Sequence, residues 1–411
     1  MTQLFHWWRA GSLDARRALI AASFGWMLDS FDVMLYALVL AHIMPDLGLT
    51  KDMAGALGSI TLLASAAGGL IFGVVADRYG RTRALMASVL IYSIFTAACG
   101  LSQTIAQLAV FRILLGIGMG GEWASGAALV SETWPAEHRG KALGFMQSAW
   151  AVGYGAAAIV TAIVLPRWGW RGVFFVGVLP AFFTLWVQRR VKEPEMWRAS
   201  RAAAAATRGR FTDIFRGSML RLTLAVTIMN AFTMFGWWGF NLWLPGYLSL
   251  PVAQGGVGLS TTVMSSFVVA MQVGMWFGYV TFGFISDAIG RKRAYVIYTV
   301  TAAVLIAIYV SITVPAGLLV LGPFVAFFAT GYFSGFGAVT AEIYPTSIRA
   351  TAQGFTYNIG RIASAAAPYA VGSLALTRGF HVALLLTSAA FLLAAVTWAF
   401  IPETRGRELQ G

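Results

Sequence analysis

The sequence predicts an all-α membrane protein with twelve transmembrane helices in two pseudo-symmetric bundles of six. Three observations support this prediction: the composition, the spacing of the apolar runs and an internal repeat. Of the 411 residues, 58% are hydrophobic and only 11% are charged, whereas soluble domains carry about 25% charged residues. The mean hydropathy is +0.73. Most of the chain is therefore expected to lie within a lipid bilayer.

Apolar runs follow one another along the whole chain, and each can cross a bilayer as a helix because about 20 residues suffice. The twelve runs lie near residues 19–43, 53–76, 84–102, 105–131, 141–165, 170–189, 219–248, 259–286, 294–313, 316–342, 351–375 and 381–401. The first run is too long for a removable signal peptide and lacks a small-residue cleavage site. Cys99 is the only cysteine and lies in an apolar run, so neither disulfides nor thiolate metal sites are expected.

The net charge of +13 is spread unevenly over the expected loops. One side of the membrane receives both termini, the loops at 77–83 and 287–293 and the basic 190–218 linker. The other side receives only Lys51, Arg167, Arg171 and Arg378. The positive-inside bias therefore predicts a multi-pass protein of the cell (inner) membrane with both termini cytoplasmic. Since the basic residues follow the loops, a lipid bilayer is expected around the chain, and no nucleic acid partner.

The chain repeats itself at an offset of 210 residues. "GVVADRYGRTR" (Gly73–Arg83) recurs as "GFISDAIGRKR" (Gly283–Arg293), and "SETWPAEHRGKALGF" (Ser131–Phe145) recurs as "AEIYPTSIRATAQGF" (Ala341–Phe355). Two parallel halves with a site between them near the midplane are typical of transporters. The expected N-terminal bundle, cytoplasmic linker and C-terminal bundle occupy residues 1–190, 191–218 and 219–411.

These motifs resemble the major facilitator superfamily. The repeated loops resemble its signature loops, "RILLGIGMGGEW" (Arg112–Trp123) resembles its helix-4 motif, and "PETRG" (Pro402–Gly406) resembles a sugar-porter tag. Within the family, "DSFD", "GGEW" and "YNIGR" are similar to the sialate:proton symporter branch, which also holds lactate-type monocarboxylate permeases. The aromatic acid:proton symporters are close neighbours. The resemblance implies a transporter that is not an enzyme and uses no cofactor or metal.

Charged residues of the repeated loops lie at expected cytoplasmic helix ends, where they can pair with each other and with helix termini. The resemblance implies that they latch the inward gate shut and separate as it opens. The expected gating residues are Asp77, Arg78, Arg81, Glu132, Arg139, Asp287, Arg291, Glu342 and Arg349.

Only five charged residues fall well inside the expected helices: Asp29, Asp32, Arg112, Glu122 and Arg361. Each costs roughly 2.5–3.5 kcal/mol at the bilayer centre, so by default it faces a cavity or another of the five and serves function. At ~1.5 Å per residue, Asp29, Glu122 and Arg361 share a layer ~15–16 Å from the inner end. None of the five recurs in the other half, which suggests acids in one half and an anion-binding cation in the other.

The four charges of the N-terminal half, Asp29, Asp32, Glu122 and Arg112, are the expected proton-coupling residues, because burial opposes the charged form of a carboxyl group. Arg361 is a fixed planar donor suited to a carboxylate. The other expected substrate-binding residues are Tyr357, Asn358, Tyr332, Gln147, Trp150 and Asn241. The predicted activity is symport of a proton with a small organic carboxylate by alternating access in a monomer, and a lactate- or pyruvate-type monocarboxylate is favoured.

Other functions stay open. An aromatic acid or sialate would satisfy Arg361 equally well. "PETRG" suggests a sugar porter, but an intramembrane arginine and three acids suit a neutral sugar poorly. A drug:proton antiporter would carry a Gly-Pro step in its fifth helix, which "AVGYGAAAIVTAIVLP" lacks. A membrane enzyme or sensor predicts a catalytic constellation or a signalling domain, and neither is evident in the sequence.

Overall fold

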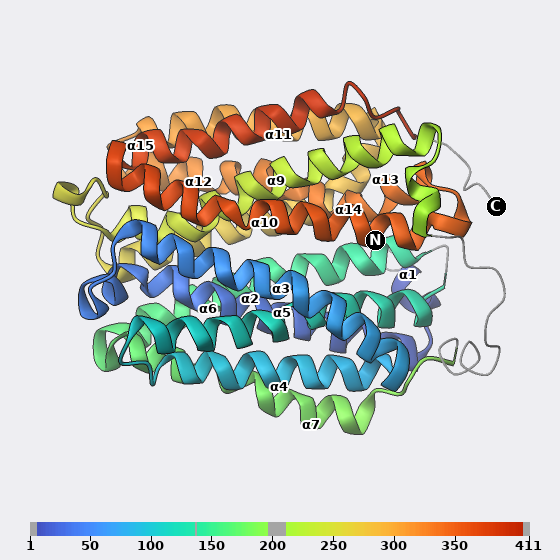
Figure 1. Cartoon of the computed structure of the whole chain (residues 1–411), viewed down its shortest axis with the longest axis horizontal. Coiled ribbons are helices and arrows are strands. Elements are labelled where there is room, and N and C mark those ends of the chain that lie inside the picture. The colour runs from blue at the N-terminus through green and yellow to red at the C-terminus, as the bar shows by residue number, and fades with distance from the viewer. Residues whose placement is uncertain (1–5, 136–137, 196–210, 406–411) are drawn as a thin grey trace. The chain divides into compact units, whose positions relative to one another are not determined.

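Long helices make up the chain in the computed structural model, which describes residues 6–135, 138–195 and 211–405 (Figure 1). Within those ranges every regular element is an α-helix or a short 3₁₀ turn, so the all-α prediction is confirmed. Three expected gating side chains lie outside the described part of the chain: Asp77, Arg139 and Arg349.

The helices form two compact units. One comprises Met1–Leu47 and Leu63–Ala204, and the other comprises Gly48–Leu62 and Ala205–Gly411. The helix α3 (Lys51–Tyr79) therefore belongs to both units: its residues up to Leu62 are part of the second unit, and those from Leu63 onward are part of the first. The helices up to α7 are α1 (His6–Ala10), α2 (Leu13–Leu47), α3 (Lys51–Tyr79), α4 (Arg81–Cys99), α5 (Ile105–Thr133), α6 (Arg139–Val176) and α7 (Pro180–Arg190). Those that follow are α9 (Ser218–Ser249), α10 (Thr261–Ile289), α11 (Arg291–Ser311), α12 (Pro315–Thr330), α13 (Phe336–Ile343), α14 (Thr346–Ser364) and α15 (Ala366–Thr397).

Ten helical ranges of the described residues are long and apolar enough to cross a membrane. Two of them, Gly140–Arg190 and Ala352–Thr397, contain 51 and 46 residues, far more than the ~20 that one crossing needs. Each bends at a glycine with positive φ, at Gly169 (65°) and Gly379 (82°), a conformation that costs glycine little. Cut at these equivalent glycines, the ten ranges accommodate the twelve predicted crossings.

The internal repeat extends to backbone packing within each unit. A Cβ atom on Gly68 of α3 would lie 2.1 Å from the carbonyl oxygen of Ile117 in α5. In the other unit, a Cβ atom on Gly278 of α10 would lie 2.5 Å from the carbonyl oxygen of Phe327 in α12. Both pairs are related by the 210-residue offset. Small residues allow such close helix contacts in membranes, so the repeat preserves a helix-packing contact as well as loop motifs.

Valine at Gly278 is expected to lower the free energy of unfolding by about 1–3 kcal/mol, because the added side chain overpacks a closed helix contact. The apparent unfolding temperature of purified protein measures this effect. Gly283→Ala on the same helix is the control, since a Cβ atom there would meet nothing within 4 Å. Equal unfolding temperatures for Gly278→Val and Gly283→Ala would contradict the close contact.

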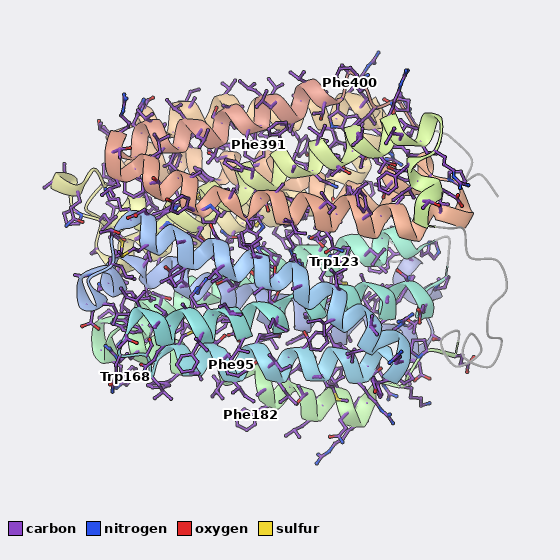
Figure 2. The ribbon with its side chains drawn as sticks, viewed as in Figure 1. Phe95, Trp123, Trp168, Phe182, Phe391 and Phe400 are labelled. Carbon is purple, nitrogen blue, oxygen red and sulfur yellow. The ribbon has the colours of Figure 1, made fainter. Side chains whose placement is uncertain are left out.

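The helix α2 is the most enclosed element of its unit. It packs against α5 and α6, and every residue from Asp29 to Leu40 is buried. A helix that is apolar on all sides is expected to be buried, and the two acids of this segment are thereby kept away from lipid. The outer surface is apolar, with Trp168, Phe182 and Phe400 among its exposed side chains (Figure 2).

Two helices that the sequence predicts as continuous are interrupted. The predicted 316–342 span consists of α12, a 3₁₀ turn at Gly331–Gly335 and α13, and the turn begins and ends with glycine, which weakens a helix. The predicted 351–375 span breaks between α14 and α15 at Ala365. Pro368 cannot donate a hydrogen bond to the carbonyl four residues earlier. The predicted spans are present at both places, and each contains a break that the apolar pattern does not specify.

Candidate functional site

Three buried acids of the first unit gather around Tyr92 of α4. The Tyr92 hydroxyl donates to the carbonyl of Gly25 in α2 at 3.3 Å. Tyr92 lies within electrostatic range of Asp29, Glu122 and Asp32. Glu122 reaches α2 from α5, because a Cβ atom on Gly25 would lie only 2.5 Å from Glu122 Oε1. Glu122 and Asp29 thus belong to one cluster, as their similar depths predict.

Asp32 is an acid with little support from hydrogen bonds. Both of its carboxylate oxygens are buried, and neither accepts a hydrogen bond of normal geometry from a residue that the structure describes. Thr96 is its near polar neighbour, but the Thr96 hydroxyl donates to the carbonyl of Tyr92 at 2.8 Å. A buried charge without donors costs several kcal/mol. The surroundings of Asp32 therefore suit a neutral carboxyl group better than a carboxylate.

Arg112 lies close to this cluster without pairing with Asp32. Its guanidinium carbon is 3.7 Å from the centre of the Tyr36 ring, and it is within electrostatic range of Cys99. Tyr36 follows Asp32 by about one helical turn, so the structure places Arg112 beyond Asp32 along α2. This agrees with the greater depth predicted for Arg112. A planar guanidinium stacked on an aromatic ring gains a cation–π interaction.

Two substrate-binding candidates of the first unit lie on α6. Trp150 packs on Trp26 of α2 with ring centroids 4.7 Å apart. Its carbonyl accepts a hydrogen bond from Ser30 at 2.8 Å, next to Asp29 in sequence. Gln147 is half-buried, about one turn before Trp150. The Trp150 position is therefore anchored against the helix that carries the acids.

Arg361 of the second unit is 3% exposed and lies in the last turn of α14, where the helix dipole favours a cation. Its guanidinium carbon is 5.8 Å from the centre of the Tyr357 ring. Among the residues that the structure describes, it makes no side-chain hydrogen bond or ion pair. Its charge is therefore not neutralised by any of these residues.

The amides and hydroxyls predicted near Arg361 are partly engaged elsewhere. Asn358 donates back to the carbonyl of Gly354 at 2.9 Å, and Asn241 donates to the carbonyl of Trp237 at 3.1 Å. The Tyr332 hydroxyl donates to the carbonyl of Thr233 at 3.4 Å. Tyr332 thus helps to hold the 3₁₀ turn against α9. Of these predicted residues, α14 itself brings only Tyr357 and Asn358 within about a turn of Arg361.

Two further amides are buried in the second unit, Asn230 and Gln272. Gln272 lies in a central helix segment and was expected among the polar pocket walls, whereas Asn230 was not predicted. Asn230 of α9 donates to the carbonyl of Thr356 in α14 at 3.4 Å, and a Cβ atom on Gly360 would lie 2.7 Å from the Asn230 Cβ. Asn230 therefore packs one residue from Arg361 along α14. Gln272 of α10 is buried, and its Oε1 atom has no partner among the described residues. Asn230 is a polar residue within an apolar run, which is the signal that could have identified it.

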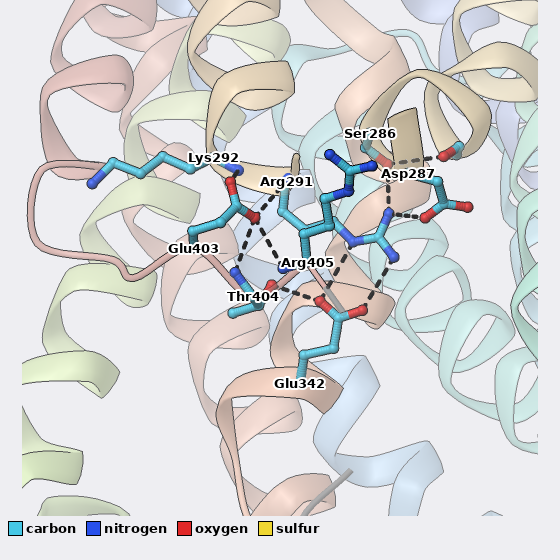
Figure 3. Close-up of polar contacts among 9 residues, drawn as sticks. Ser286, Asp287, Arg291, Lys292, Glu342, Glu403, Thr404 and Arg405 are labelled. Atoms are coloured by element: carbon cyan, nitrogen blue, oxygen red, sulfur yellow. Dashed lines mark hydrogen bonds and ion pairs between the residues drawn. The ribbon is translucent and has the colours of Figure 1, made fainter. Parts of the chain in front are cut away.

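Ion pairs join the repeated loops within each unit. Arg81 binds Glu132 at 2.8 Å, and the equivalent Arg291 binds Glu342 at 3.1 Å. Arg291 also contacts Asp287 (Figure 3). These pairs include five of the expected gating residues. Arg78 is exposed and has no ion pair with any other described residue.

A second layer of this network was missed in the sequence. Glu193 accepts hydrogen bonds from the backbone N–H groups of Thr82 and Arg83, both at 3.2 Å. Glu403, which follows Glu193 by 210 residues, accepts bonds from the N–H groups of Arg291 and Lys292 at 2.8 and 3.2 Å (Figure 3). These donors lie one residue earlier in their helix than the equivalents of Thr82 and Arg83. Each glutamate caps the N-terminus of a helix, where an anion is favoured. The two glutamates can be matched in the sequence at the 210-residue offset, but the residues around them differ and hide the repeat.

Neutralising Glu403 is expected to lower stability in a pH-dependent way. Burial alone would raise the pKa of Glu403, but the N–H groups of Arg405, Arg291, Thr404 and Lys292 outweigh it and lower the pKa below 4.5. The stabilisation is therefore present above the unfolded-state pKa and is lost as pH falls through the folded-state value. Glu403→Gln should cost about 1 kcal/mol near pH 7.

Apparent unfolding temperatures of the wild type and Glu403→Gln, measured from pH 8 down to pH 4, check this prediction. The gap between the two proteins should narrow only at the acidic end of the series. A gap that is independent of pH would show that the carboxylate charge does not contribute.

The described residues contain no group of three or more His, Cys, Asp or Glu side chains that could hold a metal ion. The buried acids and Arg361 can instead bind protons and an anion. The model of the Major Facilitator Superfamily matches residues 22–255 and 247–410. The chain belongs to the major facilitator superfamily.

Three relatives align with almost the whole length of this chain. A putative metabolite transport protein of Haemophilus influenzae is 35% identical over 96% of this chain and 97% of its own. A probable 4-methylmuconolactone transporter of Cupriavidus pinatubonensis is 33% identical over 98% and 94%. The sialic acid transporter NanX of Escherichia coli is 31% identical over 94% and 93%. The protein is a multi-pass membrane transporter and not an enzyme.

A solved structure supports the fold assignment. The crystal structure of a D-xylose-proton symporter matches with a TM-score of 0.75 at 21% identity, over 96% of this chain and 100% of the other. At this identity the likeness shows the major facilitator fold alone.

Proposed function

We propose that this transporter is a proton-coupled symporter of a small organic carboxylate that works by alternating access in the inner membrane, with both termini cytoplasmic. A lactate- or pyruvate-type monocarboxylate is the first candidate substrate, and an aromatic acid or sialate is the alternative. The observation that carries the proposal is Arg361, a buried arginine that makes no side-chain hydrogen bond or ion pair with a described residue.

A carboxylate is the ligand that Arg361 suits best. The guanidinium presents a rigid fork that matches two carboxylate oxygens, and Tyr357 limits its orientation from one side. An arginine in an apolar segment is costly unless a partner compensates for its charge. Binding an anionic substrate would supply that compensation, which a neutral sugar would not.

The acids of the first unit supply the proton-binding groups of the proposal. Asp29, Asp32 and Glu122 lie around one tyrosine, and the Asp32 oxygens accept no hydrogen bond of normal geometry from the described residues. We propose that Asp32 binds the transported proton and that the negative charges of Asp29 and Glu122 favour its protonated form. When a proton neutralises a buried acid, the free-energy cost of keeping that side chain in the membrane interior falls.

The relatives support the substrate class without selecting one acid. Two are named for 4-methylmuconolactone and sialic acid, so substrates of the organic-acid kind occur among proteins similar over the full length. The sugar-porter alternative loses its main support in the sequence. Glu403 of "PETRG" caps a helix, and Glu193 caps the equivalent helix in a different sequence context, so the tag has a structural use unrelated to sugar.

The experiment that tests the proposal is uptake into proteoliposomes with an imposed pH gradient, alkaline inside. The panel holds labelled lactate, pyruvate, an aromatic carboxylate, sialate and a neutral sugar. For one proton per monocarboxylate, accumulation of up to about tenfold per pH unit is expected, and a proton ionophore should abolish it. Accumulation of the neutral sugar alone, or carboxylate uptake that ignores the gradient, would refute the proposal.

Breaking the ion pairs of the repeated loops is expected to change conformation and not substrate preference. We propose that the Arg81–Glu132 and Arg291–Glu342 pairs hold the inward gate shut. Glu132→Gln with Glu342→Gln should then increase labelling of single cysteines placed on the inward side, by about two- to tenfold, since each surface pair contributes up to about 1 kcal/mol. Competition by the carboxylate panel should keep its order, and a changed order would contradict the gating role.

A further inference from the structure

A cavity of about 660 Å³ opens beside the N-terminus of α11 in the second unit. Its volume falls in the range of roughly 300–1,000 Å³ that is typical of small-molecule sites. Three basic residues line it, Lys292, Arg293 and Arg405. Its one acid, Glu403, already accepts backbone N–H bonds (Figure 3). The cavity therefore presents an excess of positive charge.

Two of the three basic side chains are uncommitted. Arg293 and Arg405 are exposed and make no side-chain hydrogen bond or ion pair with any residue in the described ranges. Lys292 Nζ donates to the carbonyl of Ile401 at 3.3 Å and keeps its other two protons. Ammonium and guanidinium groups gathered in this way suit a phosphate group.

The rest of the cavity is apolar and leads along the outside of α11. Its lining includes Ile289, Val296 and Ile297. Exposed apolar residues continue from Ile297 at intervals of three and four residues, namely Val300, Val304 and Ile308. This spacing keeps them on one face of the helix, and α11 is long and apolar enough to cross a membrane. A hydrocarbon chain could lie along this face below the basic cavity.

The positions of the first unit that match these residues carry less positive charge. At the 210-residue offset, Lys292 corresponds to Thr82, Arg405 to Glu195 and Arg293 to Arg83. Glu193 stands for Glu403 in both position and capping role. The formal charge therefore changes from +2 at the cavity to −1 at its counterpart. The basic cluster is an addition to the repeated scaffold and is not needed for capping the helix.

We propose that this cavity binds an anionic phospholipid, with the phosphate on Lys292, Arg293 and Arg405 and an acyl chain along the exposed face of α11. Basic residues at a membrane surface each add about 1 kcal/mol to the binding of anionic lipid, or roughly fivefold. The proposal does not depend on which substrate is transported.

The test uses the full-length protein in phosphatidylcholine nanodiscs that contain a small fraction of phosphatidylglycerol, with retained lipids counted by native mass spectrometry. The wild type is expected to retain phosphatidylglycerol in preference to phosphatidylcholine. Arg293→Gln should reduce that preference by about fivefold, and the triple change Lys292→Gln, Arg293→Gln and Arg405→Gln by tenfold or more. Arg83→Gln, at the equivalent position of the first unit, is the matched control and should retain the wild-type preference.

Glycerol 3-phosphate, which carries the phosphate without acyl chains, distinguishes a lipid site from a site for soluble anions. It is expected to displace phosphatidylglycerol only at concentrations at least tenfold higher. Equal competition by glycerol 3-phosphate would overturn the lipid assignment. An unchanged lipid preference in both Arg293→Gln and the triple variant would also overturn the assignment. Arg293→Gln is not expected to affect folding, because this exposed side chain supports no described contact.

Discussion

Replacing Arg361 with lysine is expected to weaken binding of the carboxylate substrate by about 30- to 100-fold. Lysine keeps the positive charge but loses the planar fork that binds two carboxylate oxygens. Loss of one charge-assisted hydrogen bond costs about 1.5–3 kcal/mol, and 1.4 kcal/mol corresponds to tenfold in affinity. Arg361→Ala should abolish measurable binding. Calorimetry on purified protein, with a substrate identified by the uptake panel, provides the measurement.

The controls separate a binding role from a structural one. Arg361 makes no side-chain hydrogen bond or ion pair with the residues that the structure describes, so Arg361→Lys should leave the apparent unfolding temperature near the wild-type value. Arg216→Lys, an exposed arginine of the same unit, should change neither quantity. Wild-type affinity in Arg361→Lys and Arg361→Ala would remove Arg361 from the substrate site.

The fold was largely predictable because its signals are local and repeated. Apolar runs of sufficient length specify helices that cross a membrane, and the 210-residue repeat makes the same contacts in both units, as at Gly68 and Gly278. Breaks inside helices were harder to predict. The bends at Gly169 and Gly379 lie between apolar runs that the sequence already separates. The interruption at Ala365, by contrast, depends on a proline three residues later and on the packing around it.

The candidate site was predictable in its charges but not in their partners. A charged residue in an apolar run is conspicuous, and all five such residues are buried in the structure. Their contacts depend on which helices lie side by side. The stacking of Arg112 on Tyr36, and the proximity of Glu122 to Gly25, follow from the packing of α5 against α2 and from no local pattern. For the same reason Asn230 was overlooked.

Asp32→Asn is expected to abolish proton-driven accumulation of substrate while substrate exchange continues. The amide has nearly the same shape as a protonated carboxyl group but cannot release a proton. Neither Asp32 oxygen accepts a hydrogen bond of normal geometry from a described residue, and an amide can still face the nearby Thr96 hydroxyl. The unfolding temperature should therefore equal or exceed that of the wild type. At least a tenfold loss of accumulation per pH unit is expected if one proton is transported with each substrate.

Asp29→Asn distinguishes the roles of the two acids on α2. Asp29 lies one turn from Asp32 on the same face and takes part in a further interaction of its own. Its replacement should also reduce accumulation, but with a lower unfolding temperature, since an existing contact is altered. Counterflow of labelled substrate in the absence of a pH gradient measures exchange in each variant. Normal gradient-driven accumulation in both Asp29→Asn and Asp32→Asn would exclude these acids as the proton carriers, whereas retained exchange without accumulation would separate the proton step from substrate binding at Arg361.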